Sequence, residues 1–253
     1  MPFRIMGLVD YNNGEIFDIK LNRPEKLNAM NREMLELLVD AFGKADASEE
    51  SRVVLLSGTG GSFCAGIDLA YLASLKSEED AGRAFDLFHK LNDGIWKSDK
   101  IVVVAINGYC LGGGNELAMA CDLRVAEKGA VFGQPEVRHG ITPGGGATYR
   151  LPYLIGGARA RRMMLSGNQI DADEALDIGL IDEVVEKDDA YGAAYKLCEE
   201  IAEIPEGAVA LTKRAVNSQF VYDTSAERNA FLKSLMSDSA RRKIAAFLSK
   251  RKV

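Results

Sequence analysis

The chain has 253 residues, of which 47% are hydrophobic and 27% charged, a composition that allows a large buried core and excludes an intrinsically disordered protein. Its net charge of −6 argues against non-specific nucleic-acid binding as the main task. We expect a cytoplasmic protein, because no apolar run approaches the roughly 20 residues that span a bilayer and the N-terminal sequence lacks the apolar core of a signal peptide.

Hydrophobic periodicity divides the chain into an alternating part and an all-helical part. The predicted elements are, in chain order, a hairpin of strands at 7–11 and 16–21, a helix at 34–42 that ends near Gly43, a strand at 53–56, helices at 68–75 and 81–96, a strand at 101–106, a helix at 115–121, a strand at 123–125, a helix at 147–176 that is broken at Gly156-Gly157 and Gly167, and a strand at 180–185. From Asp189 onward the pattern is only helical. It predicts an α/β body with a helical C-terminal extension, divided as 1–188 and 189–253.

The end of this extension is basic although the chain as a whole is acidic. Residues 226–253 hold eight Lys or Arg and two acidic residues, about +6, which leaves about −12 on the rest of the chain. This segment either meets an anionic group of a ligand or forms a solvated helix face, which is the usual role of a charge run.

Three glycine-rich loops are candidate phosphate cradles, but none has a nucleotide-binding pattern. The third glycine of a dinucleotide fingerprint is replaced in these loops by Phe63, Leu117 and Tyr149. No Walker A or nucleophile-elbow pattern occurs, and neither His89 nor His139 has a partner at metal-ligand spacing. The four cysteines form no C-x-x-C pair, which favours a reducing compartment and argues against a metal site.

The glycines of the segment NGYCLGGGNELAMACD (107–122) have a different meaning. They follow an apolar strand and open a helix, whose first N–H groups are unpaired and carry partial positive charge. The loop FCAGID (63–68) also enters a helix, and two N–H groups aimed at one oxygen would form an oxyanion hole. The alternative is that these glycines only allow tight turns and close packing.

Two acidic residues lie close to such loops. Glu116 stands in the first turn of an otherwise apolar helix, and Glu136 follows Gln134-Pro135. Each has a plain structural alternative, because Glu116 could stabilise its helix dipole and Glu136 could be a surface acid.

The order and spacing of six stretches resemble the crotonase superfamily, and specifically enoyl-CoA hydratases, over essentially the whole chain. The stretches are LNRPEKLNAM (21–30), SFCAGIDL (62–69), INGYCLGGGNELAMACD (106–122), FGQPEV (132–137), GITPGGGATYRL (140–151) and AFLSKRK (246–252). The resemblance implies an α/β spiral of ββα turns with a helical C-terminal trimerisation region. It also implies a homo-oligomer, either a trimer or a hexamer built from two trimers.

The resemblance further implies roles for individual residues. The backbone N–H groups of Ala65 and Gly113 fall where the family has its oxyanion hole, and Glu116 and Glu136 where it has two catalytic carboxylates. The implied substrate-binding residues are Lys26, Leu27, Ala65, Gly66, Ile67, Asp68, Gly113, Phe247 and Lys250. The last two would reach the adenine and its phosphate from a neighbouring subunit. For Asp68 a structural role at the start of a helix is favoured.

The implied activity is reversible syn addition of water to a 2-enoyl-CoA, giving a 3-hydroxyacyl-CoA, as in fatty acid metabolism. Coenzyme A enters as part of the substrate, and no metal or redox cofactor is implied. The enzyme alternatives are a Δ3,Δ2-enoyl-CoA isomerase, which mostly needs one carboxylate, or another crotonase-type lyase, with a cyclic enoyl-CoA as an open substrate choice. A CoA- or RNA-binding scaffold is the non-enzyme alternative, although the acidity of the chain disfavours RNA.

The chain departs from the family pattern at four positions. His139 stands where relatives commonly carry leucine, and Tyr149, Thr142 and Asn115 also differ. His139 either lines the acyl site or faces a subunit contact, so these departures leave the identity of the acyl group open. The aromatic cluster around Phe85 and Phe88 is favoured as core rather than acyl pocket.

Overall fold

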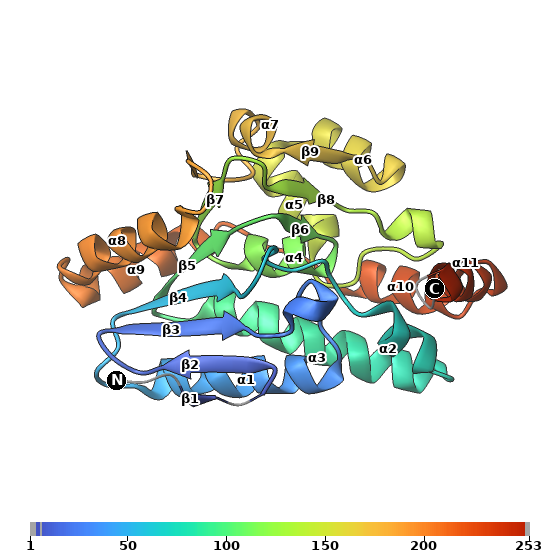
Figure 1. Ribbon diagram of the computed structural model, residues 1–253, viewed down its shortest axis with the longest axis horizontal. Coiled ribbons are helices and arrows are strands. Elements are labelled where there is room, and N and C mark those ends of the chain that lie inside the picture. Colours follow the sequence, from blue (N-terminus) through green and yellow to red (C-terminus); the bar gives the residue numbers. More distant parts are fainter. Residues whose placement is uncertain (1–3, 6, 251–253) are drawn as a thin grey trace.

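The computed structural model describes residues 4–5 and 7–250 of the chain (Figure 1). A seven-stranded sheet runs through the molecule in the order β1-β2-β3-β4-β5-β7-β10. These strands are β1 (Arg4–Ile5), β2 (Val9–Asn12), β3 (Ile16–Leu21), β4 (Val53–Gly58), β5 (Ile101–Ile106), β7 (Leu123–Glu127) and β10 (Glu183–Val185). The first three pair antiparallel, which confirms the predicted hairpin, and the others pair parallel.

A second, three-stranded sheet has the order β6-β8-β9. Its strands are β6 (Tyr109–Leu111), β8 (Val131–Gly133) and β9 (Gln169–Asp171). The helices are α1 (Arg32–Ala47), α2 (Leu69–Ser74), α3 (Glu78–Lys97), α4 (Gly113–Ala120), α5 (Ala147–Ile155), α6 (Gly157–Ser166), α7 (Ala172–Asp177), α8 (Ala190–Ala202), α9 (Glu206–Asn217), α10 (Ser225–Leu235) and α11 (Asp238–Lys250), with 3-10 helices η1 (Pro24–Lys26) and η2 (Glu136–His139). Among the helices so described, none is long and apolar enough to cross a membrane.

The chain moves repeatedly between the two sheets. It passes from β5 in the large sheet to β6 in the small sheet and then into α4, and likewise from β7 to β8 and then into η2. These turns confirm the expected α/β spiral. Two expected helices differ from the structure: α1 continues past Gly43 to Ala47, and the helix expected at 147–176 is interrupted by β9, which pairs with β8.

Both faces of the parallel strands are covered, which explains why these strands are apolar throughout. On β5, Val102 and Val104 enter a core that α1, α3 and α4 share, whereas Ile101 and Val103 enter a core beneath α8. Small residues of α8, such as Ala194, allow that helix to lie close to the sheet. The first helix after residue 188 therefore packs on the sheet, and the division of the chain at this point stays a prediction.

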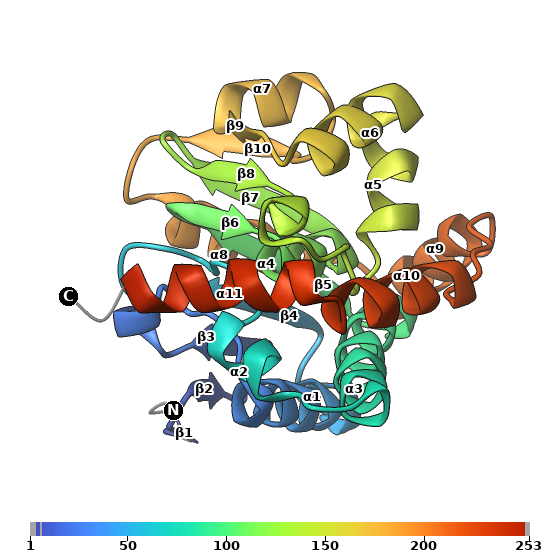
Figure 2. The same cartoon turned by 90° about the vertical axis from the view of Figure 1, so that its right-hand side faces the viewer.

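The last two helices pack against α2, α3 and η2. Figure 2 shows α11 running across the ends of the strands, where it packs on α2 and η2, and α10 continuing beside α3. Apolar side chains of these elements form a separate cluster that includes Phe85, Ile141, Phe231 and Ile244. This cluster forms one wall of the cavity described below.

A buried lysine links α9 to α3 and to the residues that precede β5 and β7. The Nζ atom of Lys213 lies 2.7 Å from Oδ2 of Asp122 and donates to the carbonyl oxygens of Ile95 and Lys100 at 3.2 and 2.9 Å. Burial raises the pKa of Asp122, and the charge of Lys213 opposes this rise. Removing the lysine would leave a buried carboxylate and two carbonyl groups without this donor.

We therefore expect Lys213→Met to lower the free energy of unfolding by about 3–5 kcal/mol, the usual cost of breaking a buried ion pair from one side. Urea unfolding at neutral pH measures this change. Lys196→Met on α8 is the matched control, because the side chain of Lys196 is 77% exposed. Equal stability of the Lys213 and Lys196 variants would contradict the role given to Lys213.

Candidate active site

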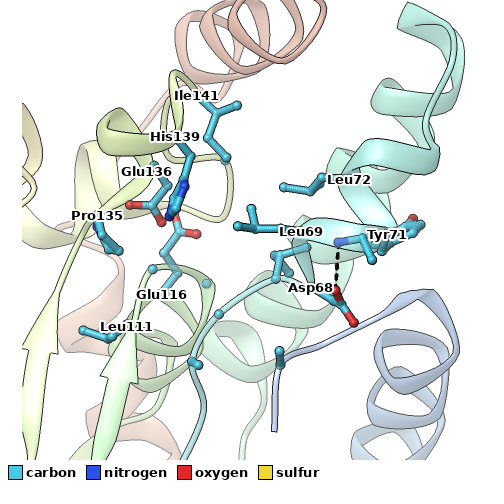
Figure 3. Close-up of a pocket in the computed structure, with 18 of the residues that line it drawn as sticks. Asp68, Leu69, Tyr71, Leu72, Leu111, Glu116, Pro135, Glu136, His139 and Ile141 are labelled. Carbon is cyan, nitrogen blue, oxygen red and sulfur yellow. Dashed lines mark hydrogen bonds between the residues drawn. The ribbon is translucent and has the colours of Figure 1, made fainter. Parts of the chain in front are cut away.

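A cavity of about 990 Å³ opens between the segment 65–72 (which includes the first turn of α2), the start of α4, η2 and the C-terminal helices. Most of the site residues predicted from the sequence line it, namely Lys26, Leu27, Ala65, Gly66, Ile67, Asp68, Gly113, Glu116, Glu136 and Phe247. The remaining one, Lys250, is exposed at the end of α11 and is not part of the wall. Figure 3 shows the carboxyl groups of Glu116 and Glu136 on the same side of this cavity, with His139 beside them.

The glycines at the start of α4 bring backbone against backbone. Gly112 has φ +52°, a conformation that favours glycine, and a Cβ atom there would lie 2.6 Å from Oε1 of Glu136. At Gly114 a Cβ atom would lie 2.3 Å from the carbonyl oxygen of Cys64. The first turn of α4 can therefore approach both the loop 62–67 and η2 only because these positions carry no side chain.

Glu116 is a buried carboxyl that is held by backbone amides. Its side chain leaves α4, the residue is 2% exposed, and Oε1 accepts hydrogen bonds from the N–H groups of Gly145 and Ala147 at 2.8 and 3.1 Å. Since Oε1 has two donors, a proton on this carboxyl belongs on Oε2. Burial raises the pKa of Glu116 well above its ordinary value, and the charges of Glu136 and Glu227 add to this rise.

Glu136 lies at the start of η2, directly against the N-terminus of α4. Burial raises its pKa to about 7, the largest effect on this group, while its own backbone N–H lowers the pKa. In the orientation that satisfies its amide, Gln134 donates to both oxygens of Glu136, at 3.1 and 3.2 Å. Sequence analysis missed Gln134, whose only signal was its place in the FGQPEV stretch.

The two carboxyls act on each other. The charge of Glu136 is the second largest cause of the raised pKa of Glu116, so ionising one of them disfavours ionising the other. At neutral pH this pair can hold one proton and one negative charge. That combination can donate a proton to one atom and accept a proton from another within a single cavity.

The structure corrects one of the two expected oxyanion donors. The N–H of Ala65 already donates to the carbonyl oxygen of Leu27 at 2.9 Å, so it cannot also serve a ligand. The N–H of Ile67 donates to no acceptor among the described residues, and Gly113 has no helical acceptor because it is the first residue of α4. A Cβ atom on Gly113 would lie 3.2 Å from the nitrogen of Ile67, which places these two amides side by side.

The loop 62–67 is held in place from the opposite side by the segment 23–30. The buried side-chain amide of Asn28 donates to the carbonyl oxygens of Thr59 and Ser62 at 2.9 and 2.8 Å. Asp68 caps α2 by accepting the N–H of Ala70, and its other oxygen pairs with Arg23 at 2.6 Å. These contacts confirm the structural role favoured for Asp68, whereas its contact with substrate stays a prediction.

The far wall of the cavity is apolar. Phe85 and Phe88 both line it, together with Leu72 and Phe231, so the cluster favoured as core is at the same time a pocket wall. The helical spacing of these aromatic residues in the sequence does not indicate whether their side chains face the core or a cavity. This wall can accept an apolar group that is attached to the reacting carbon atoms.

His139 and Phe247 meet at the side of the cavity that α11 covers. Their rings pack edge to face with centroids 5.1 Å apart, and both residues line the cavity. Burial lowers the pKa of His139, and the charge of Lys243 adds to this effect. Phe247 thus lies in the pocket of its own chain, and the expected reach into a neighbouring subunit stays a prediction.

Two thiols lie at the loop 62–67, on the side away from the cavity. Cys64 and Cys110 are buried, free and paired by a parallel β-bridge of their backbones. They hold the loop 62–67 against β6 and do not line the cavity. Within residues 4–5 and 7–250, no group of three or more His, Cys, Asp or Glu side chains is arranged to hold a metal ion.

The raised pKa of Glu136 predicts a pH-dependent gain in stability for Glu136→Gln. The folded protein holds the proton up to about pH 7, whereas the ordinary value is 4.5. Above the ordinary value the unfolded chain gains from ionisation that the folded protein resists, so the native carboxyl subtracts stability as pH rises towards 7.

Glu136→Gln should therefore raise the free energy of unfolding at pH 8 by about 3 kcal/mol, since each pKa unit corresponds to about 1.4 kcal/mol. At pH 4 the gain should vanish, because both states are then protonated. Urea unfolding at the two pH values measures the difference, with the exposed Glu199→Gln as control. An equal gain at both pH values would be inconsistent with a raised pKa.

Comparison with known proteins gives a consistent result. Residues 11–253 match the family model described as enoyl-CoA hydratase/isomerase. The chain is 37% identical to the short-chain-enoyl-CoA hydratase of Clostridium acetobutylicum, over 95% of this chain and 94% of that one, and 38% identical to the crotonyl-CoA hydratase of Syntrophomonas wolfei, over 92% and 91%. The crystal structure of an enoyl-CoA hydratase from Thermoplasma volcanium matches with a TM-score of 0.80 and 36% identity, covering 96% of each chain. The chain therefore belongs to the enoyl-CoA hydratase/isomerase family.

Proposed function

We propose that this chain is an enoyl-CoA hydratase, which adds water reversibly across the 2,3 double bond of a 2-enoyl-CoA thioester to give a 3-hydroxyacyl-CoA. The observation that carries the proposal is the pair of buried carboxyls, Glu116 and Glu136, on one cavity beside two backbone amides that have no acceptor within the described part of the chain. The names of the relatives support this reaction and point to a short acyl chain such as that of crotonyl-CoA.

The amides of Ile67 and Gly113 would bind the carbonyl oxygen of the thioester. Addition of water to the conjugated double bond moves negative charge onto this oxygen, which becomes an enolate. Two fixed N–H donors stabilise that charge more than they stabilise the neutral carbonyl, and the partial positive charge at the start of α4 acts in the same direction. Each donor of this kind contributes about 3 kcal/mol to stabilisation of a transition state.

The two carboxyls would hold the attacking water and move its protons. Glu116 and Glu136 both orient the water towards the β-carbon, and the ionised member of the pair accepts the proton that the water loses. Glu136 supplies a proton to the α-carbon, and its pKa of about 7 suits a group that gives up and regains a proton near neutral pH. These groups supply every step, so the proposed reaction needs no metal or redox cofactor.

The remaining family properties stay proposals for this chain. We propose that Lys26 and Leu27 lie along the coenzyme A part of the substrate, and that Phe247 and Lys250 meet its adenine end. A homo-oligomer, either a trimer or a hexamer, and a cytoplasmic location also follow only from the resemblance and the composition. No nucleic-acid or membrane partner is proposed.

We expect Glu116→Gln and Glu136→Gln each to lower kcat for crotonyl-CoA by at least about 100-fold, because each variant removes a group that transfers a proton. Loss of the conjugated-enoyl absorbance measures turnover, and calorimetric titration measures substrate binding, which should stay within about threefold. Glu49→Gln, at an exposed position, is the matched control.

Near-native turnover by Glu116→Gln would rule out the two-carboxyl mechanism. Faster conversion of a 3-enoyl-CoA to its conjugated isomer than hydration of crotonyl-CoA would favour the isomerase instead. Tight, salt-sensitive RNA binding without turnover would favour a scaffold.

A further inference from the structure

Glu116 is not the only carboxyl that the segment between Gly145 and Thr148 holds. Oε1 of Glu227, on α10, accepts the N–H groups of Gly146 and Thr148, each at 3.2 Å. Oε1 of Glu116 accepts the N–H groups of Gly145 and Ala147, which alternate with these two along the chain. Four consecutive amides therefore alternate between two buried carboxyls, one from α4 and one from the C-terminal helices.

The segment is packed closely against the elements that carry these carboxyls. A Cβ atom on Gly145 would lie 2.1 Å from the ring of Phe88 and 2.7 Å from Oε2 of Glu116. On Gly144 it would lie 2.6 Å from the ring of Phe231, which belongs to the same helix as Glu227. The glycines thus lie between α3, α4 and α10, and one tightly packed segment connects the two carboxyls.

Glu227 also lies against a histidine. Its residue is 3% exposed, and Oε2 lies 3.3 Å from Nε2 of His89, outside hydrogen-bond geometry, with no other partner for either atom in the described part of the chain. Nδ1 of His89 lies 3.4 Å from the hydroxyl of Tyr149, and the imidazole stacks on Phe85 at 4.1 Å. Phe85 also lines the cavity, so His89 packs against the outer side of the apolar wall.

We propose that Glu227 is a positioning residue of the reaction: it fixes the segment from Gly145 to Thr148 and thereby the carboxyl of Glu116. Glu227 touches neither substrate nor water in this role, because it does not line the cavity. The inference rests on the proposed hydration, in which Glu116 must face the reacting carbon atoms. Small misplacement of such a group can cost about 100-fold in rate.

Two substitutions separate the reach of the side chain from its carboxyl group. Glu227→Gln keeps the length of the side chain and the acceptor oxygen for Gly146 and Thr148, but removes the carboxyl group. Glu227→Asp keeps the carboxyl group but withdraws it from the amides by one methylene. Positioning predicts kcat for crotonyl-CoA within about threefold of native for Gln and reduced about tenfold or more for Asp. KM should stay within about threefold for both.

Hydrogen exchange followed by mass spectrometry provides a second readout that does not need turnover. Peptides that contain residues 144–149 should exchange faster in the Asp variant and at the native rate in the Gln variant. Glu200→Asp and Glu200→Gln are the controls, since Glu200 is exposed on α8. A Gln variant as slow as the Asp variant, or an Asp variant with native kcat and native exchange, would overturn the positioning role. Failure of the native chain to hydrate crotonyl-CoA would instead reject the proposed function.

Discussion

The approach of the first turn of α4 to the loop 62–67 is the constraint on which the rest of the site depends. Gly114 rests against the carbonyl oxygen of Cys64, and this contact leaves no room for a side chain. It sets the amide of Gly113 beside that of Ile67 and directs Glu116, one helical turn later, into the cavity. The surrounding elements maintain this contact. The loop comes after β4 and the helix after β5, which are paired parallel strands of the large sheet, and Asn28 and the ion pair of Arg23 with Asp68 hold the loop on its other side.

The acidic side chains at this contact destabilise the folded state. Glu116, Glu136 and Glu227 are buried within the reach of one another's charges, and such a group disfavours the folded state when it must ionise. The protein reduces this cost by giving four amides of the segment 145–148 to two of the carboxyls. What remains is a carboxyl pair poised to exchange protons near neutral pH, which an exposed pair would not be.

Much of this arrangement could be predicted from the sequence, and each failure has a physical cause. The run IVVVAI predicted a strand covered on both faces, and the glycines before Glu116 predicted a helix start, because both signals lie in adjacent residues. Strands β6 and β8 were missed because three residues are too few to show a period.

The choice of Ala65 as an oxyanion donor was wrong because the free amide of a loop depends on distant acceptors. The carbonyl oxygen of Leu27, 38 positions earlier in the chain, accepts the N–H of Ala65, whereas that of Ile67 has no acceptor among the described residues. Glu227 was missed for a similar reason, since its partners lie about 80 residues away. Composition and spacing carry no information about such contacts before the fold is known.

The two neighbouring thiols of Cys64 and Cys110, at the loop 62–67, affect how the protein reacts with oxidants. Burial raises the pKa of Cys64 to about 12 and that of Cys110 well above its ordinary value. At pH 7 the Cys64 side chain is therefore the neutral thiol, whereas peroxides and alkylating reagents attack the thiolate. Two sulfur atoms can therefore stand next to the amides of the active site while the native fold shields them from chemical damage, and inactivation by such reagents has to begin with local opening of the loop.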